Sequence, residues 1–412
     1  MAVEQTGHHH RIGEASRTFE PLSQPTDFSL VMGGPLYQLC RRSRLTGNEM
    51  QLLPRRVLAV LIVAWVPLLL LSVAEGHAWG RSVGLPFFYD IEMQIRLLLV
   101  GPLLVAAELL VHRRLRSIVV QFLERNLIPD TAQTTFEKAI TSAMRLRNSV
   151  WAEVFLVAFV YVVGVGLFWR SQIGVNGASW YNIPANGAWR LSMTGWWLAW
   201  VSMPLFQFLL LRWYFRLFIW ARFLWHVSRI PLNLLPTHPD RCGGLAFLGN
   251  VRIVFGPLLL AQGMPLSGMM ANRIFYAGAK LQGFKVELIG LVAVIVLAVL
   301  GPLLVFCGQL ERTKLAGLRE YGILAQRYVR EYDRKWLRGG GPPDEAFLGS
   351  ADIQSLADLS NSFEVIKEMK WMPFSARMIL ELAVTALVPV VPLMLTMISL
   401  EELVDRLLKV IF

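Results

Sequence analysis

The chain has 412 residues, of which 55% are hydrophobic and 17% are charged, and its formal net charge is +11. Soluble domains average roughly 45–50% apolar and about 25% charged residues. These values and a mean hydropathy of +0.48 exclude collagen-like, disulfide-rich secreted and disordered chains, and they predict a multi-pass membrane protein.

The positive charge and the cysteines carry little functional information. Cytoplasmic loops of membrane proteins are rich in Lys and Arg, which explains the excess of 40 basic over 29 acidic residues without nucleic acid as a partner. Cys40, Cys242 and Cys307 are too few and too far apart for a disulfide framework or a zinc site. The sequence also lacks the common nucleotide-binding, hydrolase and haem motifs, so we expect no cofactor, no metal site and no catalytic residue.

Residues 1–50 are polar and predict a disordered cytoplasmic tail. The apolar run that follows resembles a signal peptide, because Arg55 and Arg56 precede it and small residues follow it. However, its 18 residues from 57 to 74 approach the ~20 needed to cross a bilayer. We therefore predict a retained first helix.

Apolar runs predict an all-α polytopic membrane helix bundle of about seven transmembrane helices. The predicted spans are 53–75, 95–112, 150–169, 191–211, 251–270, 286–307 and 377–400. Prolines inside these spans remove a backbone donor and predict helix breaks. The break candidates are Pro102, Pro257, Pro302, Pro389 and Pro392. The fifth span is the weakest, because glycines and prolines interrupt it repeatedly.

The distribution of basic residues predicts the orientation. With the N-terminus inside, 31 Lys and Arg fall on the inner side and nine on the outer side. The excess predicts a cytoplasmic N-terminus and a periplasmic C-terminus. It also predicts that the fifth segment crosses, because a re-entrant segment would move the basic stretch after Arg312 to the outside.

The predicted inner segments are helical extensions of the membrane helices. Inner loops are expected at 113–149 and 212–250, and the largest cytoplasmic piece at 308–376. In that piece, 311–338 predicts one long basic helix, a Gly- and Pro-rich linker follows, and a second helical pattern runs over 352–370. Residues 377–412 are predicted to form the last span and a short amphipathic C-terminus.

A possible parallel repeat relates helices 2–3 to helices 6–7. The sequence Gly-Pro-Leu-Leu-Val occurs at 101–105 and again at 301–305. Each copy is followed by a hydroxyl-Phe-Glu triplet, at 135–137 and 362–364. Such repeats are known in transporters, although Leu-rich helices also match by chance.

Three carboxylates lie inside predicted spans, near their inner ends: Glu108, Glu153 and Glu381. Ionisable side chains within a membrane are costly and are treated first as functional candidates, here as an ion or proton pathway. The alternative is that each pairs with a nearby base. These bases would be His112 for Glu108, Arg147 or Arg170 for Glu153, and Arg377 for Glu381.

The inner loop 236–249 is the most motif-like stretch. Its candidate residues are His238, Asp240, Arg241, Gly243 and Gly244. Alternation of His238, Asp240 and Cys242 allows a weak metal site, and the glycines beside Arg241 allow an anion site. The favoured alternative is structural, with Asp240 forming an Asx-type turn. The stretch resembles an HPDRxGGLxFLG-type loop in uncharacterised bacterial multi-pass membrane proteins, which implies a bacterial inner-membrane setting but no activity.

Aromatic and basic residues around the fourth span indicate contact with lipid. Nine of the 14 Trp lie between Trp169 and Trp225, as in an interfacial aromatic belt, although an aromatic cage for a quaternary amine is also conceivable. After this span, residues 212–229 predict a basic, aromatic amphipathic helix on the inner leaflet that attracts anionic lipids. A homo-oligomer is compatible with these features.

Breaks in the helices, intramembrane carboxylates and the possible repeat favour a channel-like or secondary-transporter-like protein that moves an ion or small solute. Two alternatives from other classes stay open. One is a non-transporting scaffold or sensor whose basic inner helices bind lipid or a partner. The other is a membrane enzyme that uses the His238 loop on a phosphorylated or lipid substrate.

Overall fold

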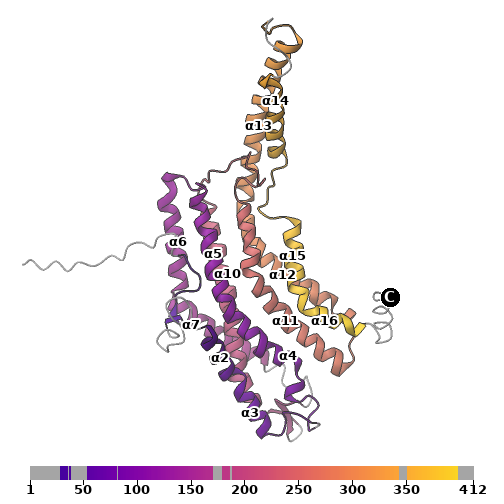
Figure 1. The fold of residues 1–412 in the computed structure, drawn as a ribbon. Coiled ribbons are helices and arrows are strands. Elements are labelled where there is room, and N and C mark those ends of the chain that lie inside the picture. The colour runs from indigo at the N-terminus through magenta and orange to yellow at the C-terminus, as the bar shows by residue number, and fades with distance from the viewer. Residues whose placement is uncertain are drawn as a thin grey trace, which may run out of the picture.

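The computed structural model describes residues 28–35, 37–38, 53–80, 82–169, 179–185, 188–342 and 350–397. These residues form a long all-α bundle from which one helical hairpin projects (Figure 1). Among them, six helices are long and apolar enough to cross a membrane, and a bent helix pair passes the same test when its two helices are counted as one span. The predicted class of a polytopic helix bundle is therefore confirmed.

The first half of the chain contains three candidate membrane spans and the bent pair. Their helices are α2 (Leu53–Ala64), α3 (Val66–Ala74), α4 (Ile91–Gln94), α5 (Gly101–Glu124), α6 (Gln133–Arg147), α7 (Val150–Phe159), α9 (Met193–Trp197) and α10 (Met203–Val227). Three π-helical segments, Ile95–Val100, Val160–Trp169 and Leu198–Ser202, continue α4, α7 and α9. The bent pair consists of α6 and α7, whose paths differ by 47°.

The second half contributes three crossings and the projecting hairpin. Its helices are α11 (Val251–Ala277), α12 (Lys285–Leu300), α13 (Cys307–Tyr332), α14 (Ala351–Lys367), α15 (Ala376–Leu387) and α16 (Val391–Met394). Short 3₁₀ segments at Gly301–Phe306 and Val388–Val390 join α12 to α13 and α15 to α16.

The predicted helix breaks occur at some prolines and not at others. Pro102 begins α5 directly after a π segment, and Pro302 and Pro389 lie in 3₁₀ segments. Pro392 begins α16. In contrast, α11 runs through Pro257 without interruption, so the break expected there is absent.

Helix α11 is continuous because its small residues allow neighbouring helices to approach closely. A Cβ at Gly263 would collide with the carbonyl oxygen of Ala386 in α15, and one at Gly268 would lie 2.8 Å from the Cα of Glu92 in α4. Packing of backbone against backbone on two sides holds the helix where the prolines remove hydrogen bonds. The segment expected to be the weakest span is therefore a 27-residue helix, and among the candidate spans it is the most buried.

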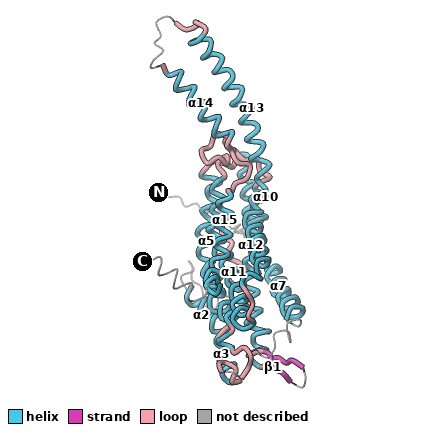
Figure 2. The backbone as a smooth tube through the Cα atoms, turned by 90° about the vertical axis from the view of Figure 1, so that its right-hand side faces the viewer, coloured by secondary structure: helices cyan, strands magenta, loops and turns pink. Residues whose placement is uncertain are grey.

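The hairpin of α13 and α14 is the part of the chain farthest from the α3 end of the bundle (Figures 1 and 2). Residues 281–337 form one 57-residue helical run, about 85 Å long at 1.5 Å per residue. At its far end, Asp352 accepts hydrogen bonds from Lys335 Nζ at 2.8 Å and Trp336 Nε1 at 3.0 Å. Both helices predicted between residues 308 and 376 are thus present, and they pack against each other.

Residues 28–34 are packed into the bundle, although we predicted a disordered tail over 1–50. The Phe28 side chain is fully buried, and its ring lies 5.1 Å from the ring of Phe223 in α10. Ser29 Oγ lies 2.8 Å from His112 Nδ1 of α5, and its carbonyl accepts from Arg147 Nη1 of α6 at 2.5 Å. Apolar anchors at the end of a polar segment explain the difference, because burying them offsets the cost of ordering the chain.

A two-stranded hairpin lies beside α3, at the end opposite α13 and α14 (Figure 2). Its strands β1 (Asn182–Ala185) and β2 (Ala188–Leu191) pair antiparallel, with Asn182 opposite Leu191. Glu75, just after α3, accepts hydrogen bonds from the backbone of Met193 at 2.6 Å and from Thr194 Oγ1 at 2.5 Å. These contacts tie α3 to the N-terminus of α9.

Candidate functional site

Four charged side chains meet inside the bundle and form what we call the arginine cluster: Arg56 of α2, Glu108 of α5, and Arg212 and Arg216 of α10. Arg56 pairs with Glu108 Oε2. Arg216 Nη2 donates to Glu108 Oε1 at 2.5 Å, and Arg212 Nη1 donates to the same oxygen at 3.4 Å. One carboxylate is therefore shared by three guanidinium groups.

The cluster is enclosed by the helices that carry it. Glu108 is 3% exposed and Arg216 is 2% exposed. Arg216 also lies over the ring of Trp213, 4.9 Å from its centroid, and Trp213 Nε1 donates to the carbonyl of Leu104 at 3.1 Å. Buried charges persist only where opposite charges and hydrogen bonds replace their water, so these contacts specify how α2, α5 and α10 are rotated.

Sequence spacing explains why two arginines reach the same carboxylate. Arg212 and Arg216 are four residues apart and so share one face of α10. Trp220 and Phe223 are buried on the same helix, which also makes this face the inward one. The predicted amphipathic helix on the inner leaflet is therefore wrong for this stretch, since α10 continues straight from the span with both arginines inside.

Glu153 of α7 lies at the edge of the cluster. Its Oε1 is 4.0 Å from Arg212 Nε, and the side chain is 14% exposed. Residues 28–34 pass the same place, because a Cβ at Gly34 would lie 3.0 Å from Glu153 Oε1. Two of the three predicted intramembrane carboxylates, Glu108 and Glu153, are thus brought together around Arg212.

Glu381 lies elsewhere, on α15. It pairs with Arg377 Nε at 3.0 Å, as the pairing alternative predicted, and also with Arg252 Nε of α11 at 2.6 Å. The Glu381 side chain is 37% exposed and the Arg377 side chain 87%. It is a surface ion pair, separate from the arginine cluster.

The pairing predicted for Glu108 is wrong, and Arg147, one of the two bases predicted for Glu153, donates hydrogen bonds elsewhere. His112 contacts Ser29 and not Glu108, which the arginines occupy. Arg147 donates to the Ser29 carbonyl and to Asn148 Oδ1 at 3.0 Å. The alternative base for Glu153, Arg170, lies outside the described residues.

The 236–249 loop is organised by Asp240. Its Oδ1 accepts from the backbone N–H groups of Cys242 at 2.8 Å and Gly244 at 3.1 Å, and its Oδ2 accepts from Ala246 N at 3.1 Å. His238 Nδ1 lies 2.9 Å from the same carboxylate. The Asx-type structural interpretation therefore describes this loop, because the carboxylate is occupied by its own backbone.

Arg241, another candidate residue of this loop, links the loop to the C-terminal end of α14. Arg241 pairs with Glu368 at 2.8 Å, and its carbonyl accepts from Lys370 N at 2.7 Å. Gly243 and Gly244 have φ of +61° and +98°, which residues other than glycine rarely adopt.

Burial, and secondarily the carboxylate of Asp240, raises the pKa of Cys242 to about 11. This thiol is therefore a poor metal ligand and nucleophile at neutral pH.

Among the described residues, no group of three or more His, Cys, Asp or Glu side chains could hold a metal ion.

Sequence reasoning missed Arg56, Arg212 and Arg216 as partners of Glu108. A usable signal was present, because Arg56, Arg212 and Arg216 each lie near the end of an apolar run, as Glu108 does. Comparisons with protein-family models, curated proteins and solved structures found no match. A functional assignment therefore rests on the geometry of the chain itself.

Proposed function

We propose that this membrane protein is transporter-like or channel-like, and that a small solute moves past the arginine cluster. The observation that carries the proposal is a set of three arginines and two carboxylates that meet between the apolar helices. Replacing buried ion pairs by apolar residues often costs nothing or stabilises a protein, so a role in stability alone does not account for them. Charged groups facing the interior of a membrane bundle commonly mark ion and solute pathways.

The test is flux through full-length protein in liposomes, measured for protons, K⁺, chloride, nitrate and phosphate. Glu108→Gln and Arg212→Lys should reduce the flux of the transported ion to background. Arg212→Lys keeps the charge and serves where Glu108→Gln fails to fold. Glu331→Gln is the matched control, because Glu331 forms an exposed ion pair with Arg327 outside the bundle. No flux of any ion in the panel, or unchanged flux in both cluster variants, would overturn the proposal.

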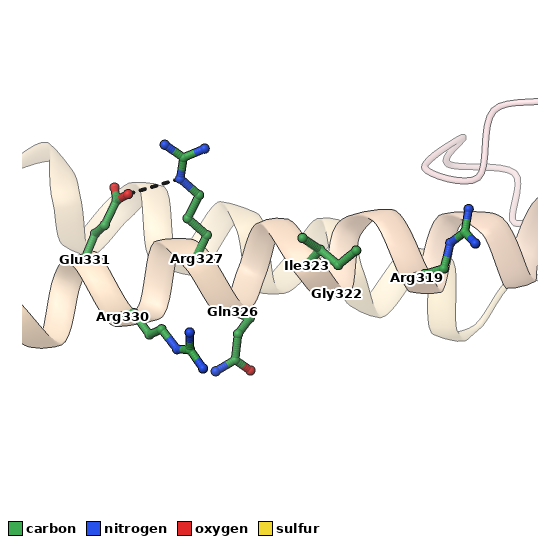
Figure 3. Close-up of a pocket in the computed structure, with 7 residues that line it drawn as sticks. All are labelled: Arg319, Gly322, Ile323, Gln326, Arg327, Arg330 and Glu331. Atoms are coloured by element: carbon green, nitrogen blue, oxygen red, sulfur yellow. Dashed lines mark hydrogen bonds and ion pairs between the residues drawn. The ribbon is translucent and has the colours of Figure 1, made fainter.

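A scaffold or sensor is the second candidate, and the surface of α13 favours it. A shallow groove there is lined by Ile323 and by Arg319 and Arg330 on either side (Figure 3). Ile323 is 66% exposed and Leu315 is 60% exposed. An apolar strip between arginines on a projecting hairpin suits a protein or lipid partner.

Trimming the linker 339–351 separates these two candidates. A transporter should keep its flux after the trimming and lose it in the cluster variants. A scaffold should tolerate the cluster variants and lose its function when the hairpin is shortened. The third candidate, a membrane enzyme, gains no support from the His238 loop, since the Asp240 oxygens are occupied by backbone donors.

We propose that the membrane is the bacterial inner membrane, with the N-terminus and the hairpin cytoplasmic and the C-terminus periplasmic. The loop resemblance and the 31 to nine division of basic residues support this setting. A membrane-impermeant maleimide should label Gly283→Cys on intact spheroplasts, and Ser360→Cys only after lysis. The native Cys242 should react slowly, because its thiol is buried with a pKa of about 11. Labelling in the reverse order would contradict this orientation.

Anionic lipids at the inner face, and a second copy of the chain, are proposed partners. The inner basic residues support the first, since each Lys or Arg near an anionic surface contributes about 1 kcal/mol of attraction. Stability that rises with the phosphatidylglycerol content of nanodiscs would support it, and light scattering of the detergent complex would give the oligomeric state.

A further inference from the structure

The arginine cluster and its neighbour Glu153 contain more positive than negative charge. Arg56, Arg212 and Arg216 carry three positive charges, and Glu108 and Glu153 supply two negative charges. One positive charge is therefore uncompensated within this group. An uncompensated charge inside a protein is strongly unfavourable, because the surroundings cannot replace its water.

The cluster, and the face of α10 that carries two of its arginines, also hold hydrogen-bond donors without acceptors. Among the described residues, Arg56 Nη1, Arg216 Nη1 and Trp220 Nε1 are buried and have no hydrogen-bond partner. The Arg56 and Arg216 side chains are only 10% and 3% exposed. Both arginines bond Glu108 through Nη2, which places their free Nη1 groups beside the same carboxylate.

Trp220 adds a third donor from the same helix face. It lies four residues after Arg216 on α10, one turn farther along. A buried donor without an acceptor costs about 1–3 kcal/mol, and more when it is charged. Unmet donors next to excess positive charge require an acceptor that is itself negative.

We infer that the arginine cluster binds one small monovalent inorganic anion, of the chloride or nitrate type, between the guanidinium groups of Arg56 and Arg216. One missing negative charge fits a monovalent ion, and divalent phosphate or sulfate would overcompensate it. A lipid headgroup remains attached to its acyl chains and does not fit arginines that are this enclosed. The inference names the solute class of the proposed pathway and rests on that proposed function.

The direct test is ³⁵Cl NMR line broadening with the full-length protein in detergent, with gluconate holding the ionic strength constant. Broadening should saturate with chloride and be reversed by nitrate. Arg56→Gln and Arg216→Gln should weaken chloride binding by at least about tenfold, the loss of one charge-assisted hydrogen bond. Arg252→Gln is the matched control, because Arg252 pairs with Glu381 outside the cluster.

Removing a buried arginine can unfold the protein, so Arg216→Lys and Trp220→Phe form a second set. Each keeps the charge or the ring and removes a donor, and each should weaken binding while the melting temperature without chloride stays measurable. Broadening that does not saturate, or that is equal in all variants, would overturn the inference. Tighter competition by sulfate or phosphate than by nitrate would overturn the monovalent assignment.

Flux measured in parallel separates this inference from the proposed function. Saturable binding that depends on the cluster, without anion flux, would retain the site and overturn the transport proposal. Flux of another ion without anion binding would retain transport and overturn the site. Chloride flux that is lost in the same variants as binding would support both.

Discussion

Two buried carboxylates in this protein have equal exposure and opposite surroundings. Asp90 and Glu108 are each 3% exposed. Asp90 accepts hydrogen bonds from Met93 N at 3.1 Å, Trp180 Nε1 at 3.0 Å and Asn272 Nδ2 at 2.9 Å, all of which are neutral donors. The partners of Glu108 in the arginine cluster are all cations.

The difference distinguishes a carboxylate that holds the fold from one that belongs to a charged site. Neutral donors stabilise the Asp90 carboxylate and tie α4, the segment at Trp180 and α11 together, without bringing in any further charge. The three cations around Glu108 carry more positive charge than one carboxylate neutralises. Two of their donors, Arg56 Nη1 and Arg216 Nη1, have no acceptor. We therefore interpret the Asp90 network as structural and the arginine cluster as the candidate site.

The largest effect is expected for Glu108→Ala. This change leaves three buried guanidinium groups without their shared carboxylate, and breaking a buried ion pair costs about 3–5 kcal/mol. The apparent melting temperature and the monodisperse fraction in detergent should both fall sharply relative to wild type and to Glu331→Gln. A melting temperature equal to that of the control would show that Glu108 is not what holds the arginines.

Asp90→Ala should have the next largest effect. It leaves three buried donors without an acceptor but no unpaired buried cation, so we expect a loss of about 2–3 kcal/mol. Asp90→Asn keeps one acceptor oxygen and should lose less. The melting temperatures of both variants, compared with the exposed Asp333→Asn, test this. A larger loss than in Glu108→Ala would reverse the comparison.

Asp240→Asn extends the comparison to a carboxylate outside the membrane-spanning helices. Its three donors are backbone N–H groups, and its side chain is 15% exposed, so water can replace part of what is lost. We expect a loss of about 1–2 kcal/mol. Limited proteolysis of the 236–249 loop would detect its loosening. A loop that is equally protected in the variant would argue against this role of Asp240.

Glu381→Gln should have the smallest effect on stability, although cations surround Glu381 as they do Glu108. Its pairs with Arg252 and Arg377 lie at the surface of the bundle and not inside it, and ion pairs at a surface contribute about 0–1 kcal/mol. The melting temperature should therefore stay close to that of the wild type. Flux through the same variant tests the expectation from sequence that Glu381 lines the pathway. Loss of flux in Glu381→Gln would support that expectation.

The spans and the hairpin were predictable from the sequence because their signals are local. Apolar run length predicted the six long apolar helices and the apolar half of the bent pair, and the linker after 338 predicted where the long helix ends. The break expected at Pro257 did not occur, since close packing at Gly263 and Gly268 supports α11 from outside its own sequence. The anchoring of Phe28 was missed for a similar reason, because its partners lie on α10.

The sequence by itself determined the membrane class, the apolar helices and the presence of carboxylates near their ends. Only the tertiary structure decided which charges meet. The partners of Glu108 lie 52 residues before it and 104 and 108 residues after it. Which faces of α2, α5 and α10 turn toward one another depends on how whole helices pack and rotate. This packing depends on side chains from segments that are distant in the sequence, so no single segment predicts it.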